Sequence, residues 1–301
     1  MPKRKKRGDN DTPWKKILRQ YFPQAIEFFF PLVAEKIDWS KPCEFLDKEF
    51  QKIAPDAEQG KRYADKLVKV WLKDGRSTYL LLHVEIQAQK EEEFALRMLI
   101  YNIRIFDHFG SFATSLAILC DPNSAWRPQG CVLESPATRL AFEFGQVKLL
   151  DYRERWEALE QSKNLFAPVV MAHLKTQETK RSPKQRKEWK FGLMRRLYEQ
   201  GWSQQEIFYF YEFVDWVMIL PEALETQFWQ ELKQFEETRK MRYITNAERF
   251  ALREADEQAR LEIAQAMLNE GMPLENIAKL TKLSVDRIQQ LQASLSQPSE
   301  S

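Results

Sequence analysis

Hydrophobic and polar residues alternate most clearly between residues 63 and 89, where the chain reads "YADKLVKVWLKDGRSTYLLLHVEIQAQ". Successive side chains of a strand point to opposite faces of its sheet, so this alternation predicts two strands. They are joined at Asp74-Gly75, a dipeptide typical of β-hairpin turns. One face of the second strand is apolar throughout: Leu80, Leu82, Val84, Ile86 and Ala88. The other face begins with Tyr79 and Leu81 and then becomes polar: His83, Glu85, Gln87 and Gln89.

The segments around this hairpin predict helices and further strands. Apolar residues recur at helical spacing in "KEEEFALRMLIYNIRIFDHFG", which predicts a helix that ends at Gly110. A helix is also predicted over Cys43 to Ala54, and broken helices over residues 13 to 40, where two prolines interrupt the pattern. The runs at 111–121 and 140–151 predict buried strands. This order of elements predicts an α/β fold with a mixed sheet flanked by helices.

From about residue 153 the pattern becomes helical. We therefore predict four parts, with a basic disordered tail first and an all-α C-terminal extension last: residues 1–12, 13–152, 153–246 and 247–296. The aromatic residues of the third part are expected to form the core between its helices. The charged segment Lys175 to Lys190, "KTQETKRSPKQRKEWK", is predicted to be a solvated linker.

The C-terminal part predicts two short helices packed across a tight turn. Gly271 ends a longer helix, Pro273 suits the first turn of the next helix, and Ser284 can cap the last one. The residues expected to pack are Ile277, Ala278, Leu280, Leu283, Val285, Ile288 and Leu291. The pattern resembles a helix-turn-helix. If this pair binds DNA, the expected contacts are Lys279, Lys282 and Arg287; a plain packing or dimerisation element fits the same pattern.

Composition narrows the class of protein. Lys and Arg number 46 and Asp and Glu 44, a net charge of +2, so any basic binding surface must come from local clustering. The three cysteines contain no CxxC pair and fit a reducing compartment better than a zinc site. No segment approaches the roughly 20 apolar residues of a membrane helix, and no apolar run follows the basic start. We expect a cytoplasmic protein that makes no membrane contact.

The hairpin offers two carboxylates to one site. With a three-residue loop over residues 74–76, Asp65 would lie directly opposite Glu85, with Cβ atoms about 5 Å apart on one face. A two-residue loop would instead place Asp65 opposite Val84, on the other face. Two carboxylates this close repel each other unless a proton or cation intervenes. Mg²⁺ prefers oxygen ligands, so the three-residue loop predicts a magnesium site.

Asp65, followed by "HVEIQ" (residues 83–87) at a strand end, resembles the core of the PD-(D/E)XK nucleases. The closer similarity is to their recombination-promoting nuclease and putative transposase branch, the Rpn-like proteins. Three segments carry it in the expected order: "KRYADKLVKVWLKDG", "LLHVEIQAQ" and "FALRMLIYNIRIFDHFG". The similarity covers roughly residues 40 to 150 and continues more loosely through "NLFAPVVMAHL" and "FVDWVMILP". It implies a restriction-endonuclease-like core within residues 13–152.

The resemblance also implies an activity and roles for named residues. Asp65 and Glu85 would hold Mg²⁺, or Mn²⁺ in its place, for hydrolysis of DNA phosphodiester bonds in a recombination context. Gln87 occupies the position of the superfamily's lysine and would position water or phosphate without carrying a charge. Glu49, on the helix before the hairpin, would support the site, with Glu44 as the alternative to it. Arg97 and Arg104, on the helix after it, are candidates for phosphate contacts.

Two other functions fit the same residues. Because Gln87 is uncharged, the chain could be a catalytically weak or inactive nuclease-fold protein that binds DNA. The helical second half could instead make it a protein–protein interaction protein. Any of the three is compatible with a homo-oligomer. Glu85 and Gln87 could also be solvated residues of a sheet edge, and His83 is more often a hydrogen-bonded structural histidine than a metal ligand.

Overall fold

A computed structural model of the chain describes residues 13–54, 63–85 and 93–239, and the C-terminal residues 260–261, 263–268, 271–281, 283, 285, 288–289 and 291–292. The chain divides into two compact units. The larger spans residues 9–239, and the smaller includes residues 240–301.

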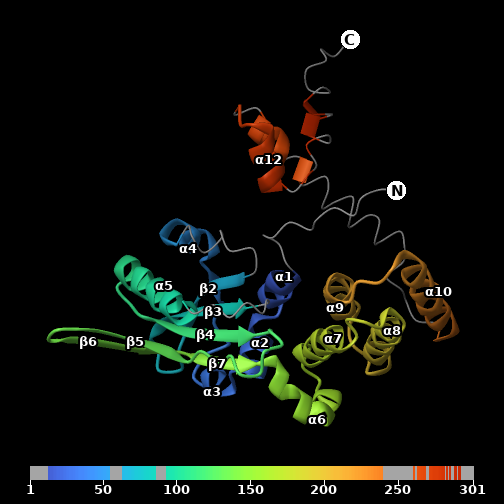
Figure 1. The fold of residues 1–301 in the computed structure, drawn as a ribbon, viewed down its shortest axis with the longest axis horizontal. Coiled ribbons are helices and arrows are strands. Elements are labelled where there is room, and N and C mark those ends of the chain that lie inside the picture. Colours follow the sequence, from blue (N-terminus) through green and yellow to red (C-terminus); the bar gives the residue numbers. More distant parts are fainter. Residues whose placement is uncertain are drawn as a thin grey trace. The chain divides into compact units, whose positions relative to one another are not determined.

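The larger unit contains a mixed five-stranded sheet. Its strands are β1 (Glu44–Phe45), β2 (Tyr63–Trp71), β3 (Ser77–Glu85), β4 (Ala113–Leu119) and β7 (Gly145–Lys148), in the order β1-β2-β3-β4-β7. The pairs β1–β2 and β2–β3 are antiparallel, whereas β3–β4 and β4–β7 are parallel. The prediction of an α/β fold with a mixed sheet flanked by helices is confirmed (Figure 1).

The predicted register of the β2–β3 hairpin is wrong by two residues. Ser77 pairs with Trp71, so that Asp65 lies opposite His83 and Glu85 lies opposite Tyr63. The loop does contain three residues, but they are 73–75, because the Leu72 N–H donates to the Arg76 carbonyl (2.7 Å) and the Gly75 N–H to the Leu72 carbonyl (2.9 Å).

The physical reason is the position of the glycine. A three-residue hairpin loop is a type I turn followed by a left-handed residue, so the left-handed residue comes last. Gly75, with φ of +89°, takes that last position. The predicted loop over residues 74–76 instead puts this glycine in the middle.

Two helices cover one face of the sheet. They are α4 (Asp47–Ile53) and α5 (Phe94–Phe109), and their side chains share a core cluster with the strands: Leu46, Phe50, Ala54, Leu67, Leu81, Tyr101, Ile105 and Ala113. The α5 helix ends at Gly110 (φ +66°), as predicted. The predicted helix over Cys43 to Ala54 is shorter than expected, because Glu44 and Phe45 pair with β2 as the edge strand β1.

The opposite face of the sheet is also buried. Val68, Val70, Leu80 and Leu82 are at most 1% exposed. The chain before β1 forms α1 (Pro13–Gln20), α2 (Phe22–Phe29) and α3 (Pro31–Ala34), and α1 lies against β2. The predicted breaks are confirmed, since Pro23 and Pro31 each lie in the first turn of a helix.

The predicted strand over residues 140–151 is instead parts of three elements. Two of them are β6 (Thr138–Glu143) and β7, and the third is the 3-10 helix η2 (Leu149–Arg155). β6 pairs with β5 (Gly130–Ser135) in a separate hairpin, which extends from the body of this unit (Figure 1). At the start of β7 a Cβ on Gly145 would lie 2.9 Å from Leu116 Cδ2, so a residue without a side chain lets β7 approach β4 closely.

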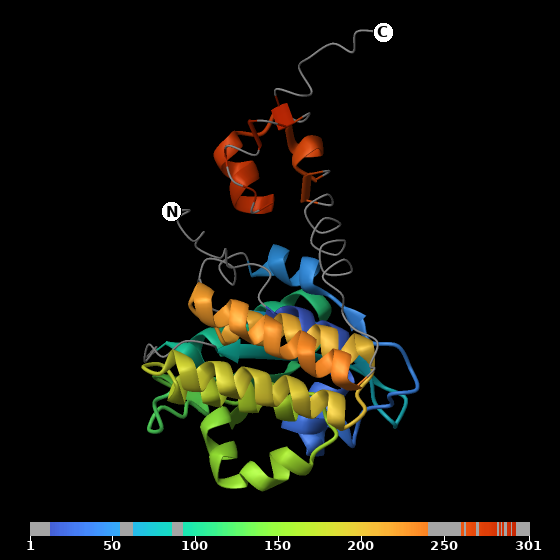
Figure 2. The same ribbon diagram turned by 90° about the vertical axis from the view of Figure 1, so that its right-hand side faces the viewer.

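The rest of the larger unit is helical, as predicted. It comprises α6 (Trp156–Gln161), α7 (Phe166–Glu178), α8 (Pro183–Glu199), α9 (Gln204–Val217) and α10 (Glu222–Arg239). Figure 2 shows α8 and α10 side by side. Phe210, Phe213 and Phe228 are fully buried, which confirms their expected place in the core between these helices.

The prediction of a solvated linker over Lys175 to Lys190 is wrong. Helix α7 continues to Glu178, and α8 begins at Pro183 after a short turn. Proline is well tolerated at the first position of a helix, where its missing N–H has no intrahelical partner. Lys190 is fully buried, and its Nζ lies 3.2 Å from Asp215 Oδ1 and 3.0 Å from Glu225 Oε2.

The smaller unit packs short helical segments around a small core. Residues 263–268 are helical, and α12 (Leu274–Thr281) follows after Gly271 (φ +73°). The Met272 N–H donates to the Met267 carbonyl and the Gly271 N–H to the Leu268 carbonyl, the two bonds of a Schellman C-cap. Ala264, Ile277 and Ile288 are fully buried, and Ala278, Leu283 and Leu291 pack against them.

Two residues expected in this core are exposed. Leu280 is 54% exposed and Val285 is 38% exposed. The predicted cap Ser284 lies outside the described residues. Over the described part of the chain, none of the helices combines the length and the apolar character needed to cross a membrane.

Candidate functional site

The backbone places Asp65 and Glu85 on adjacent strands. Glu85 is the last residue of β3, and Asp65 lies on β2 opposite His83, two positions from the partner of Glu85. Strand residues two apart share a face, so positions 65 and 85 belong to the face of Leu67 and Leu81, which α4 and α5 cover. The corrected register therefore keeps both positions on one face, as diagonal rather than direct neighbours.

Glu49 lies in the first turn of α4, the helix that packs over this face. Its neighbour Phe50 is buried in the core cluster with Leu67, and the Phe50 ring contacts the Tyr101 ring of α5 edge-on, with centroids 5.4 Å apart. Glu49 itself is half-buried. The α4 helix thus holds a third carboxylate-bearing position over the face that carries positions 65 and 85.

Helix α5 carries the two candidate arginines. Arg97 is half-buried, with its guanidinium carbon 5.3 Å from the centroid of the Phe94 ring. Arg104 is also half-buried, two turns further along the helix. Between them, Tyr101 is 2% exposed and its ring belongs to the core cluster.

The lysines of β2 are both engaged by carboxylates of other elements. Lys66 is buried, with its Nζ 2.6 Å from Asp47 Oδ2, and Lys69 Nζ lies 3.9 Å from Glu44 Oε2. Burial lowers the pKa of Lys66, and the hydrogen bond to Asp47 opposes that effect. Both lysines are therefore engaged in ion pairs with carboxylates of other elements. Gln87 lies outside the described residues.

The remaining candidates belong to the smaller unit. Lys279 is exposed on α12, whereas Lys282 and Arg287 lie outside the described residues. An exposed lysine on a short helix can contact a phosphate through its charge. The expectation that these residues bind DNA stays a prediction.

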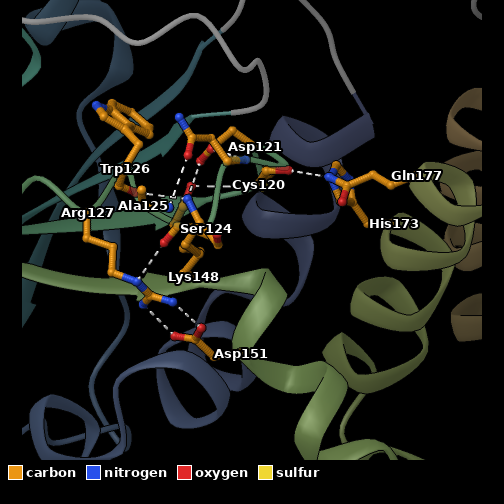
Figure 3. Close-up of polar contacts among 12 residues, drawn as sticks. Cys120, Asp121, Ser124, Ala125, Trp126, Arg127, Lys148, Asp151, His173 and Gln177 are labelled. Carbon is orange, nitrogen blue, oxygen red and sulfur yellow. Dashed lines mark hydrogen bonds and ion pairs between the residues drawn. The ribbon is translucent and has the colours of Figure 1, made fainter.

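Sequence reasoning missed a buried ion pair beside the candidate site. The Nζ of Lys148, the last residue of β7, lies 2.7 Å from Asp121 Oδ2, and both side chains are almost fully buried (Figure 3). Lys148 Nζ also donates to the Trp126 carbonyl (2.9 Å) and lies 5.6 Å from the centroid of the Trp126 ring. Glu85 pairs with Leu119 and Leu119 with Lys148, so this ion pair lies at the same edge of the sheet as Glu85.

Hydrogen bonds and an ion pair hold the loop after β4 at this edge. Asp121 Oδ1 accepts from the Asn123 N–H (2.9 Å), and Asn123 Oδ1 accepts from the Ala125 N–H (3.0 Å). Arg127 then forms a two-pronged ion pair with Asp151 of η2, with Nη1 2.8 Å from Oδ2 (Figure 3). The hydrogen bonds from Arg127 lower the pKa of Asp151.

Two side chains of α7 fasten the start of the same loop. His173 Nε2 donates to the Cys120 carbonyl (2.8 Å), and Gln177 Nε2 donates to the same oxygen (2.7 Å) (Figure 3). A carbonyl only accepts hydrogen bonds, so Nε2 of His173 carries the hydrogen. Burial lowers the pKa of His173, and the hydrogen bond to Cys120 opposes that effect. In the sequence, one residue indicates this buried polar cluster, namely Asp121, which directly follows an apolar strand.

The donor chemistry of the predicted residues fits a hard cation. Asp65, Glu85 and Glu49 would supply carboxylate oxygens, the ligands that Mg²⁺ prefers. Among the side chains that the structure describes, no group of three or more His, Cys, Asp or Glu residues could hold a metal ion. Any site built on Asp65 and Glu85 lies outside that search, because the side chains of these two residues are not described.

The molecule therefore combines an α/β unit, in which acidic positions share one face at a strand end, with a separate small helical unit. Residues 257–293 match the family model described as the Rpn/YhgA-like nuclease family, C-terminal HTH domain. The match supports the predicted relationship to the Rpn family, and its helix-turn-helix domain suggests DNA binding. Neither the curated proteins nor the solved structures gave a match to this chain.

Proposed function

We propose that this protein is a Mg²⁺-dependent DNA endonuclease of the recombination-promoting type, with a restriction-endonuclease-like core within residues 13–152. The observation that carries the proposal is the register of the β2–β3 hairpin, which keeps positions 65 and 85 on one face of adjacent strands. The match of the C-terminal residues to a domain of a nuclease family supports it independently.

The spacing of these positions suits one shared ion. Diagonal residues of an antiparallel pair are about 7–8 Å apart. Over that distance the side chains of Asp65 and Glu85 can bring both carboxylates to one cation. Mg²⁺ bound there would polarise the scissile phosphate and lower the pKa of a bound water. Glu49, on the helix above, would accept a hydrogen bond from that water or join the ligands.

Other polar side chains of the protein would orient the water and contact the DNA. Gln87 would orient the attacking water through its amide, without the positive charge that a lysine supplies. Arg97 and Arg104 would contact the phosphates of the bound strand. The Asp121–Lys148 pair would keep the neighbouring strand ends rigid, because breaking a buried pair is costly.

DNA would be held mainly by the smaller unit, through Lys279, Lys282 and Arg287. A chain that ends at residue 250 should bind plasmid DNA more weakly than the full chain. Because each phosphate contact releases counterions, its affinity should also depend less steeply on salt. Equal affinity and an equal salt slope for the two chains would contradict this role.

Cleavage of supercoiled plasmid tests the activity. The full chain, Asp65→Asn, Glu85→Gln and the control Asp74→Asn are incubated with Mg²⁺, Mn²⁺ or EDTA. Asp74 belongs to the same hairpin but lies in its exposed loop, paired with Arg76. We expect metal-dependent nicking that falls by on the order of 10²–10³ in the first two variants and stays unchanged in Asp74→Asn.

The alternatives give different results in the same assay. Retardation of the plasmid without nicking would favour a DNA-binding protein that keeps the fold without the activity. No retardation and no nicking would favour a protein–protein interaction protein. Nicking that survives in both Asp65→Asn and Glu85→Gln would contradict the assignment of these residues.

A further inference from the structure

The β5–β6 hairpin has an unpaired edge. β5 and β6 form a two-stranded sheet by themselves, and no third strand of the described chain pairs with β6. Apolar side chains along the hairpin are exposed: Val132 by 51%, Leu133 by 44% and Leu140 by 42%. Cys131 and Phe142 pack the base of the hairpin against the body of the unit. Beyond them the two strands stand alone, and because a two-stranded hairpin is marginally stable in water, a further strand along β6 would stabilise this part.

The ladder determines which backbone groups face the free edge. The Phe144 N–H donates to the Gln129 carbonyl (3.0 Å), so this pair is a hydrogen-bonded pair of the antiparallel ladder. Hydrogen-bonded and non-hydrogen-bonded pairs alternate along such a ladder. Counting from Phe144, alternate residues of β6 bond inward to β5. The remaining residues present their N–H and C=O groups at the free edge: Arg139, Ala141 and Glu143.

We propose that β6 pairs antiparallel with β6 of a second copy of this chain, with Ala141 at the two-fold axis. The three outward-facing residues then bond to the same three residues of the second copy. In this register Arg139 lies opposite Glu143 of the second copy, and by symmetry the reverse pair also forms. Leu140 lies opposite Phe142 on one face, so the exposed apolar side chain gains an apolar neighbour.

The charges of the hairpin favour a second copy of this chain over a nucleic acid as the partner of β6. Its charged residues are Glu134, Arg139 and Glu143, so a phosphate backbone along it would meet two carboxylates and one guanidinium. Arg139 Nε lies 2.9 Å from Glu134 Oε1 of its own chain, and both side chains are 65% exposed. Such an exposed pair contributes little, so Arg139 is available to an acidic partner. This inference does not depend on the proposed nuclease activity.

Charge reversal in the full-length chain tests the pairing. Arg139→Glu puts like charges opposite each other in both symmetric pairs, and so does Glu143→Arg. Sedimentation equilibrium should therefore show about tenfold weaker self-association for each variant. A mixture of the two variants restores opposite charges in every pair and should associate as a heterodimer with near wild-type affinity. Glu134→Gln, which removes only the pair within the chain, should associate like the wild type.

Ala141→Pro provides a second variant, since it removes the central outward N–H but no bond of the β5–β6 ladder. It should abolish the association while far-UV circular dichroism stays unchanged. The proposal is overturned if the wild-type chain sediments as a monomer at about 0.1 mM. It is also overturned if a dimer forms whose affinity neither charge reversal nor Ala141→Pro changes, because the contact then lies elsewhere.

Discussion

At the scale of single residues, the larger unit depends on buried charged and polar groups at one edge of its sheet. Lys148 and Asp121 neutralise each other's charge, and both side chains are almost fully buried. His173 binds the carbonyl of Cys120, the residue before Asp121. Such groups are costly to bury unless each one is paired. Removing one member of a pair should therefore cost more than removing both.

The Asp121–Lys148 pair makes this testable. Asp121→Asn keeps the oxygen that accepts from Asn123 but leaves Lys148 buried without its counter-charge, so we expect a loss of about 3 kcal/mol in the free energy of unfolding. The double variant Asp121→Asn/Lys148→Met also removes the unpaired charge of Lys148, so it should be more stable than Asp121→Asn alone. Equilibrium denaturation in urea measures these two variants and the single variant Lys148→Met. A double variant whose loss equals the sum of the two single losses would contradict the coupling.

The buried His173 should make the stability of the folded chain depend on pH. Burial lowers its pKa in the folded chain below the ordinary value of 6.5 that it has in the unfolded chain. As the pH falls below 6.5 the unfolded state takes up a proton that the folded state does not, so stability is lost towards acid and is fully present above that pH. The stability difference between wild type and His173→Gln should narrow on acidification, by at most about 1.4 kcal/mol per pH unit. His108→Gln, at an exposed site on α5, serves as control. A difference for His173→Gln that is constant between pH 7.5 and 5.5 would contradict the assignment.

At the scale of elements, periodicity predicted what the backbone does where one face is buried. The strands of the hairpin and the helix that ends at Gly110 follow directly from their apolar spacing. The register failed, because it depends on which loop residue takes the left-handed conformation, and alternation along the strands says nothing about that. The linker over residues 175–190 failed because charge alone does not show that Lys190 is buried between two carboxylates of distant helices. Of the Asp121–Lys148 pair, the sequence marks only Asp121, which directly follows an apolar strand. Its partner Lys148 lies 27 residues further on and could not be identified from the pattern.

Substitutions of two glycines test how far the hairpin loop and helix α8 depend on a residue without a side chain. Gly75→Ala forces a side chain onto a residue with φ of +89° and should destabilise the chain by about 1 kcal/mol. Gly192→Ala, within α8, adds a methyl group with no atom within 4 Å and should stabilise it by about 0.5–1 kcal/mol. Urea denaturation of the two variants should therefore give shifts of opposite sign. A neutral Gly75→Ala would mean that the loop does not depend on its left-handed residue.

At the scale of the whole molecule, the two units divide the proposed work. The α/β unit would hold the metal and cut DNA, and the smaller unit, which matches a helix-turn-helix domain, would bind it. A net charge of only +2 suits this division, because binding then depends on local contacts and not on a generally basic surface. Pairing through β6 would bring two α/β units into one assembly.

The proposed activity requires Asp65 and Glu85 to ligate the same divalent ion. Electron paramagnetic resonance of Mn²⁺ titrated into the purified full chain measures this without any DNA or turnover. We expect a bound Mn²⁺ that Mg²⁺ displaces. Both Asp65→Asn and Glu85→Gln should lose this bound Mn²⁺, and Asp74→Asn should retain it. Mn²⁺ binding that is unchanged in either Asp65→Asn or Glu85→Gln would show that the two carboxylates do not share an ion.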